Sequence, residues 1–139
     1  MGGGRWEVGG GRRPTSDLQP AYTFLGAFAA DGRLLGYACY GPTPGTDHTY
    51  DLYWIAVDPA AQGTGTGTLL LGEVERRLAA VHGRLLVIET SSRPEYAATR
   101  AFYQARAYDE AARVGSFYAP DDDRVIYTKR VKAALAGTE

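Results

Sequence analysis

Cysteine is nearly absent from this sequence, and its absence excludes two kinds of site. The 139 residues contain one cysteine, Cys39. A single thiol forms no intramolecular disulfide and supplies no cysteine set for structural zinc. Cys39 lies in an apolar stretch, so we predict a small core residue there. His48 and His82 lack partners at metal-ligand spacing, and no metal site is predicted.

An excess of charge of either sign is also missing. Fifteen Lys and Arg stand against sixteen Asp and Glu, which gives a formal net charge of -1. No basic field therefore attracts nucleic acid or an anionic membrane, and an anionic ligand must be bound locally. No apolar run approaches the roughly 18–20 residues that span a bilayer. Residues 1–20 lack the hydrophobic centre of a secretory signal, so we predict a cytoplasmic protein without nucleic-acid or membrane partners.

The composition indicates one globular domain with short flanking segments. Residues 1–20 are rich in glycine and arginine and contain few side chains that could form a core. We predict a flexible N-terminal segment there. Residues 21–133 carry the apolar periodicity of a single domain, and residues 134–139 form a C-terminal tail.

Apolar patterns within the domain predict strands and helices in alternation. Asp31-Gly32 separates two aromatic-rich runs and supplies the positive φ angles of a tight hairpin. Four apolar residues recur at helical spacing from Leu70 onward, and Gly83 is placed to cap that helix. The continuous apolar run that follows predicts a strand buried on both faces, so residues 50–89 form a β-α-β unit. The predicted strands are residues 22–30, 33–40, 48–57, 85–90, 108–118 and 124–131, and a second helix spans residues 94–106.

A glycine-rich loop between the third strand and the first helix has the sequence Gln62-Gly63-Thr64-Gly65-Thr66-Gly67. Alternating glycines let successive backbone N–H groups turn toward one point, and the helix N-terminus adds partial positive charge. The loop therefore predicts a phosphate or pyrophosphate site that needs no lysine. A P-loop is excluded because Thr68 and Leu69 follow Gly67, and a dinucleotide motif because its third glycine falls on Thr68 or Leu70.

The loop does match the pattern Q/R-x-x-G-x-G/A, met by Gln62, Gly65 and Gly67. On this pattern the chain resembles the GNAT superfamily of acetyl-CoA-dependent N-acetyltransferases. A second match, TRAFYQARAY at residues 99–108, is similar to the superfamily's later helix with its Phe-Tyr pair, although Ala107-Tyr108 replaces the usual Gly-Phe. The resemblance covers residues 22–131. It implies an α/β (α+β) fold with a mixed, mostly antiparallel twisted sheet, a central β-α-β unit and a splayed strand pair for CoA.

The resemblance also implies a site for acetyl-CoA as cosubstrate. The backbone N–H groups of the loop would cradle the CoA pyrophosphate. The strand edge before the loop would pair with the pantetheine arm, and its backbone donors would polarise the thioester carbonyl. The residues assigned to the cofactor in this way are Ile55, Ala56, Val57, Gln62, Gly63, Thr64, Gly65, Thr66, Gly67 and Thr68.

Acetyl transfer to an amine requires a neutral amine, a stabilised oxyanion and a proton for the leaving thiolate. By resemblance, Tyr103 matches the tyrosine that protonates the CoA sulfur in many family members. Its neighbour Phe102 shares a helical stripe with Ala98 and Ala105. We expect that stripe to pack on the sheet.

The base that takes the amine proton stays open at this point. Many family members have a Glu on the strand before the loop, where this chain has Tyr53. Asp51 lies two residues earlier on the same strand face, and Glu89 ends the following strand. Either of these carboxylates acts as the base, directly or through water, or the amine enters the site already deprotonated. The carboxylates of residues 121–123 are expected to form a solvated hairpin turn.

The chain departs from the family pattern at its N-terminus. Family members usually begin with a strand and one or two helices that wall the acceptor groove, whereas about twenty glycine-rich residues stand there in this chain. Three alternatives follow for the wall of the acceptor groove: it is minimal in this chain, it is supplied by another subunit, or it belongs to a longer protein of which this sequence is a part. A sheet face left bare would favour a homodimer, which a monomeric mass in solution would contradict.

We therefore predict an N-acetyltransferase that moves acetyl from acetyl-CoA to a primary amine of a small molecule or protein, by direct attack on the thioester. The alternative is a non-catalytic CoA-binding module with an incomplete acceptor site. The sequence does not identify the acceptor, because specificity lies in loops and in the N-terminal elements.

Overall fold

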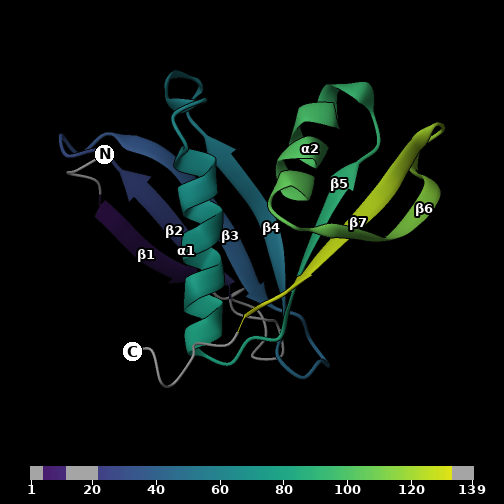
Figure 1. Ribbon diagram of the computed structural model, residues 1–139, viewed down its shortest axis with the longest axis horizontal. Coiled ribbons are helices and arrows are strands. Elements are labelled where there is room, and N and C mark those ends of the chain that lie inside the picture. Colours follow the sequence, from purple (N-terminus) through teal and green to yellow (C-terminus); the bar gives the residue numbers. More distant parts are fainter. Residues whose placement is uncertain (1–4, 12–21, 133–139) are drawn as a thin grey trace.

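The structure, a computed structural model, describes residues 5–11 and 22–132. In these ranges seven strands form one sheet in the order β1-β2-β3-β4-β5-β7-β6, with both α-helices on one face (Figure 1). All neighbouring strands are antiparallel except β4 and β5, which confirms the predicted mixed fold. The elements are β1 (Arg5–Gly11), β2 (Tyr22–Phe28), β3 (Leu34–Pro42), β4 (Thr49–Val57), the 3-10 helix η1 (Pro59–Ala61), α1 (Thr66–Ala80), β5 (Leu85–Ser91), the 3-10 helix η2 (Pro94–Tyr96), α2 (Ala97–Ala105), β6 (Asp109–Ala119) and β7 (Asp122–Arg130).

The N-terminal segment differs from its prediction. Arg5–Gly11 forms strand β1 and pairs antiparallel with β2 along its whole length. The prediction of a flexible segment is therefore wrong for these seven residues. An edge strand is joined to its sheet by backbone hydrogen bonds, to which glycine contributes as well as any residue, so composition was a poor guide. Residues 1–4, 12–21 and 133–139 lie outside the described residues, and so does the predicted tail.

Strands β2 and β3 form the predicted hairpin with a different turn. Among the loop residues only Gly32 has a positive φ, of 89°. The Gly32 N–H donates to the Ala29 carbonyl at 2.9 Å, and the Ala29 N–H donates to the Arg33 carbonyl at 2.9 Å. The connection is thus a three-residue loop closed by a left-handed glycine.

Helix α1 connects the parallel strands β4 and β5, which confirms the predicted β-α-β unit. Its buried side chains include Leu70, Leu71, Val74 and Leu78, and they pack on β2, β3 and β4. Burial of a continuous apolar stripe is the main source of stability for such a helix. In the described ranges, no helix has both the length and the apolar character that a bilayer crossing requires.

The end of α1 differs from the predicted glycine cap. His82, not Gly83, adopts the left-handed conformation, with φ 63°. The His82 N–H donates to the Ala79 carbonyl at 3.1 Å, and the Gly83 N–H donates to the Leu78 carbonyl at 2.7 Å. These two bonds form a Schellman motif. Gly83 is needed for space, because a Cβ there would lie 3.0 Å from the Leu78 carbonyl oxygen.

Two burial predictions are wrong. Strand β5 is not buried on both faces, because Leu86 and Ile88 are buried while Glu89 is exposed. Its apolar run resembles a doubly covered parallel strand, but both helices lie on the same face of this sheet (Figure 1). In α2, Ala98 and Ala105 are exposed. The helix packs on the sheet through Tyr103 instead, which is its buried residue.

The opening between β4 and β5 sets the place of the site. Pairing of the two strands runs only from Thr49 opposite Leu85 to Leu52 opposite Ile88. Beyond these pairs β4 stays paired with β3, and β5 with β7. The strands diverge as a wedge (Figure 1), which confirms the predicted splayed pair.

A β-bulge marks the start of this divergence. Leu52 lies opposite Tyr40 and Trp54 lies opposite Cys39, so Tyr53 is the additional residue of β4 at this bulge. A bulge adds one residue to one strand, bends it and increases its twist. Tyr53 is thus the residue at which β4 turns away from β5.

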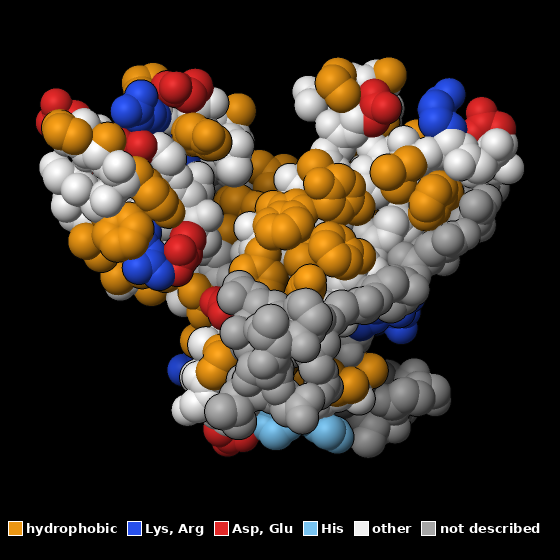
Figure 2. All heavy atoms as spheres, turned by 180° about the vertical axis from the view of Figure 1, so that it is seen from behind, with side chains coloured by type: hydrophobic (Ala, Val, Ile, Leu, Met, Phe, Trp, Pro, Cys, Tyr) orange, Lys and Arg blue, Asp and Glu red, His pale blue; other side chains and the backbone are white. Residues whose placement is uncertain are grey.

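The sheet face away from the helices carries an aromatic row. Phe24, Cys39 and Trp54 are cross-strand neighbours. The Phe24 ring lies 5.5 Å from Tyr22, 6.5 Å from Tyr37 and 6.1 Å from Trp54. Figure 2 shows hydrophobic side chains gathered in the middle of this face. Cys39 is buried, which confirms its core assignment. The homodimer predicted for such a face stays a prediction.

We expect the two residues that end α1 to respond oppositely to substitution. Gly83→Ala should lower the free energy of unfolding by about 1–3 kcal/mol, because the new Cβ meets a backbone carbonyl that has no room to move. His82→Gly should raise it by about 0.5–1 kcal/mol, because glycine adopts the positive φ without strain. Urea unfolding of both variants measures this, and equal losses would contradict the described helix end.

Candidate active site

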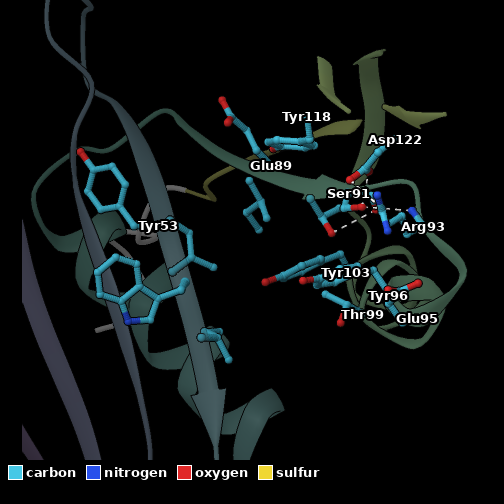
Figure 3. A pocket seen from close by; sticks show the side chains of 15 residues that line it. Tyr53, Glu89, Ser91, Arg93, Glu95, Tyr96, Thr99, Tyr103, Tyr118 and Asp122 are labelled. Atoms are coloured by element: carbon cyan, nitrogen blue, oxygen red, sulfur yellow. Dashed lines mark hydrogen bonds and ion pairs between the residues drawn. The ribbon is translucent and has the colours of Figure 1, made fainter. Parts of the chain in front are cut away.

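The wedge between β4 and β5 holds a cavity of about 640 Å³ (Figure 3). Its walls come from β4, β5 and the start of α2, with Tyr118 and Asp122 on the far side. A loop cavity of about 370 Å³ lies beside the glycine loop. An apex cavity of about 290 Å³ lies where β4 and β5 separate, and it is lined by Asp51, Glu89 and Tyr118.

The glycine loop presents backbone donors to the loop cavity. Gly63 and Gly65 have φ of 82° and 89°, which glycine adopts without strain. Gly65 is the N-cap of α1, and no side chain caps the helix there. The N–H groups of the first helical turn, residues 66–68, have no acceptor within the helix. These donors and the positive end of the helix dipole favour an anion.

The predicted loop residues do not all face this cavity. Gln62, Gly63 and residues 65–68 line it. Thr64 does not, because its hydroxyl donates to the Ala61 carbonyl and lies 2.9 Å from the Thr66 hydroxyl. The Gln62 N–H donates to the carbonyl of residue 59 at 3.3 Å. In the described part of the chain, Gly63, Gly65 and residues 66–68 therefore offer the better backbone donors.

The edge of β4 joins the wedge cavity to the loop cavity. Ile55 lines the wedge cavity and Val57 lines the loop cavity, with Ala56 between them opposite Tyr37 of β3. Since this segment pairs with β3 alone, alternate N–H and C=O groups along it face the wedge. Gln62 Nε2 donates to the Val57 carbonyl at 3.4 Å. The edge offers strand-like partners to an extended amide-bearing ligand.

Tyr103 is the buried residue of α2, with 6% of its surface exposed. Its ring lies 5.4 Å from Phe102, 5.8 Å from Tyr108 and 6.3 Å from Tyr127. Figure 3 shows its hydroxyl pointing across the wedge toward β4. Burial raises the pKa of Tyr103 to about 12, so the phenol is protonated at neutral pH.

The two candidate bases meet at the apex cavity. Glu89 forms an ion pair with Arg124. Asp51 accepts a hydrogen bond from the Thr43 hydroxyl at 2.8 Å. Burial first, and then the charge of Glu89, raise the pKa of Asp51 above its usual range. Glu89 lines both the wedge and apex cavities, whereas Asp51 lines the apex cavity only.

The carboxylates after β6 do not form the solvated turn that was predicted. Asp122 is buried; it accepts from the Ser91 hydroxyl, and it pairs with Arg93 Nε at 3.0 Å. Asp123 accepts from the N–H of Ser116 at 2.8 Å and pairs with an arginine. Only Asp121 is fully in the turn and exposed. Asp122 therefore joins the β6–β7 hairpin to the end of β5 beside the wedge.

In the described ranges, no three His, Cys, Asp or Glu side chains cluster closely enough to hold a metal ion. The family model of the acetyltransferase (GNAT) family matches residues 5–126. The chain belongs to the GNAT acetyltransferase family. It is therefore an acyltransferase.

Solved structures share this fold. A protein from Desulfovibrio desulfuricans assigned to this family is 47% identical, with a TM-score of 0.78 over 80% of this chain and 69% of that chain. An aminoglycoside 6'-N-acetyltransferase solved with coenzyme A shares 15% identity and a TM-score of 0.70, covering 82% of this chain and 75% of its own. The acetyltransferase-like yncA of Salmonella typhimurium, solved with acetyl-CoA, shares 21% identity and a TM-score of 0.68, covering 83% and 68%. No curated protein matches. Acetyl-CoA is the cosubstrate of this GNAT enzyme.

Sequence reasoning missed several residues of this GNAT site. Asp122 and Arg124 reach partners 31 and 35 positions away, at Ser91 and Glu89. Arg106 reaches 38 positions to Thr68. No local pattern marks such contacts, because periodicity and motifs report neighbours within a few residues. The extended bulge of β6 that brings Tyr118 to the wedge likewise has no sequence signal that we identify.

We expect Asp122→Asn to loosen the hairpin of this GNAT enzyme, because an amide does not replace the carboxylate between Ser91 and Arg93. The free energy of unfolding should fall by about 1–3 kcal/mol in urea denaturation. Asp121→Asn is the matched control at the exposed neighbour and should stay within about 0.5 kcal/mol of the parent. Indistinguishable variants would refute the structural role of Asp122.

Proposed function

We propose that this enzyme transfers the acetyl group of acetyl-CoA to a primary amine of a small molecule or protein by direct attack on the thioester. The observation that carries this proposal is the wedge cavity itself. A protonated phenol, Tyr103, points into it from α2. Two carboxylates, Asp51 and Glu89, lie at its apex on the opposite side.

The positions of the wedge and loop cavities along the β4 edge support one pose of the cosubstrate. The pyrophosphate would accept from the N–H groups of Gly63, Gly65 and residues 66–68, and the pantetheine arm would extend along the β4 edge from Val57 to Ile55. The thioester would then lie near the bulge at Tyr53. Backbone N–H groups of the β4 edge would donate to its carbonyl oxygen as negative charge develops there. These donors are fixed by the sheet, so little reorganisation is needed.

In the transfer step the amine nitrogen attacks the acetyl carbon and the carbon–sulfur bond breaks. The departing sulfur takes a proton from Tyr103, which later regains one from solvent, and the attacking nitrogen loses its extra proton to a base as the amide forms. A pKa of about 12 keeps the phenol protonated but makes it a weak acid. Proton donation therefore accompanies cleavage of the carbon–sulfur bond, when the sulfur is most basic.

Asp51 is the base that we propose for the amine proton. Burial and the charge of Glu89 raise the pKa of Asp51 despite the opposing hydrogen bond from Thr43, and a raised pKa favours uptake of a proton, whereas Glu89 is paired with Arg124. The wedge and apex cavities share Leu52 and Glu89 among their lining residues, so a water chain would connect the amine to Asp51. Glu89 would tune Asp51 through its charge.

Tyr103→Phe tests the proposed reaction. The phenyl ring keeps the packing but has no proton to give, so kcat with a responsive amine should fall roughly a hundred- to ten-thousandfold. Acetyl-CoA binding should stay within about twofold, because the hydroxyl is not among the phosphate donors. Steady-state kinetics and calorimetry measure the two. An unchanged kcat would contradict the acid role, and a parent that binds acetyl-CoA without acetylating any of a broad amine panel would support the binding-module alternative.

The pH profile separates the two carboxylates. If Asp51 is the base, kcat/KM falls as pH drops through its raised pKa, and Asp51→Asn removes this acid limb. Glu89→Gln removes a negative charge beside Asp51, which lowers the pKa of Asp51 and moves the limb to lower pH. Loss of the limb in Glu89→Gln, with its retention in Asp51→Asn, would assign the base to Glu89 instead.

A further inference from the structure

We infer that Arg106 is a phosphate-binding residue of the cofactor site. This inference adds a residue to the proposed pose of acetyl-CoA and rests on the proposed function. Arg106 is the C-cap of α2, and its side chain crosses to the start of α1. Its Nε and Nη2 donate to the Thr68 hydroxyl at 3.0 and 2.5 Å, and its Nη1 donates to the Phe102 carbonyl at 2.8 Å. Both Arg106 and Thr68 line the loop cavity.

The charge of Arg106 has no protein partner that compensates for it. Both acceptors above, the Thr68 hydroxyl and the Phe102 carbonyl, are neutral, and no ion pair of Arg106 occurs in the described part of the chain. The first turn of α1 contains no acidic residue. The guanidinium thus lies beside the positive end of a helix dipole, which is unfavourable without an anion between them.

The position of the guanidinium is fixed by packing. Its central carbon lies 3.9 Å from the centroid of the Phe102 ring. The same ring closes on α1, where a Cβ at Gly67 would lie 3.3 Å from it. Arg106 is therefore placed by the contact of the two helices, and it lines the loop cavity together with the glycine loop. A pre-organised guanidinium loses little entropy on binding.

Phosphate is the ligand chemistry that this arrangement fits. A guanidinium has five N–H donors, and the described contacts use three. The two that remain match the paired oxygens of a phosphate, as the backbone N–H groups of the glycine loop and the first turn of α1 do. The cofactor has phosphate in two places, the pyrophosphate and the ribose 3'-phosphate. Whichever of these two phosphates Arg106 binds, its contact favours a thioester that carries the nucleotide over a short acyl-pantetheine that lacks it.

Arg106→Gln tests the assignment in the full chain, with Arg76→Gln as control. Arg76 is an exposed arginine of α1 that pairs with Glu73, away from the loop cavity. Calorimetry with acetyl-CoA should give a Kd about ten- to a hundredfold weaker for Arg106→Gln and unchanged for Arg76→Gln. Binding of S-acetyl-pantetheine, which has no phosphate, should be equal in all three proteins.

A second measurement separates binding from folding. Because Arg106 opposes the helix dipole, Arg106→Gln without ligand should unfold at the parent's temperature or above it, while its shift with acetyl-CoA shrinks. Acetyl-dephospho-CoA distinguishes the sources: a loss of affinity that persists with it assigns the pyrophosphate, and a loss that disappears assigns the 3'-phosphate.

Two results would overturn the inference. One is an Arg106→Gln protein that binds acetyl-CoA as the parent does. The other is a protein that melts well below the parent without ligand and binds acetyl-CoA and S-acetyl-pantetheine equally poorly, which would make Arg106 structural. A parent that binds no acetyl-CoA would instead overturn the proposed function, so the two failures are distinguishable.

Discussion

The early end of pairing between β4 and β5 is the constraint on which the rest of the site depends. Sheet strands normally satisfy their backbone groups on both sides, and a strand that leaves its neighbour exposes a row of donors and acceptors. Here β4 leaves β5 after four residue pairs, Thr49–Leu85 to Leu52–Ile88. The free edge faces the wedge cavity, where in the proposed pose a ligand with amide groups would supply the missing partners.

Each functional group is positioned by its relation to that wedge. The glycine loop comes after the C-terminal end of β4, and the carboxylates Asp51 and Glu89 lie where β4 and β5 separate. Tyr103 comes from the helix that leads away from β5. The proposed acid and the proposed bases thus lie on different elements and in different surroundings. Burial keeps the phenol of Tyr103 protonated, and Asp51 has a raised pKa next to a second carboxylate.

Local features of the fold and site were predictable from the sequence. The glycine loop, the amphipathic α1 and the Phe-Tyr pair of α2 are contiguous patterns whose physical meaning is contained within about one turn or strand. Burial was harder. The run in β5 has the composition of a doubly covered strand, and only the placement of both helices on one face shows that Glu89 is exposed. The glycines of β1 were read as disorder, because composition does not reveal backbone pairing.

The three consecutive aspartates show where sequence reasoning reaches its limit. Asp121, Asp122 and Asp123 are chemically identical, yet one is exposed, one is buried against Ser91 and one binds the N–H of Ser116. Their difference depends on elements about 30 positions away in the chain, and on a bulge of β6 that places four residues opposite one. Nothing within the tripeptide distinguishes the three roles.

The bulge at Tyr53 has a consequence for how this strand tolerates change. Side chains alternate between faces along a strand, so one extra residue reverses the alternation. Leu52 on one side of the bulge and Ile55 on the other therefore both point to the helices, although three positions separate them. The alternation of side chains in one half of β4 therefore does not determine which face a side chain takes in the other half. The half that pairs with β5 holds its side chains in the core. The half that borders the wedge can change its exposed side chains without shifting the register of the paired half.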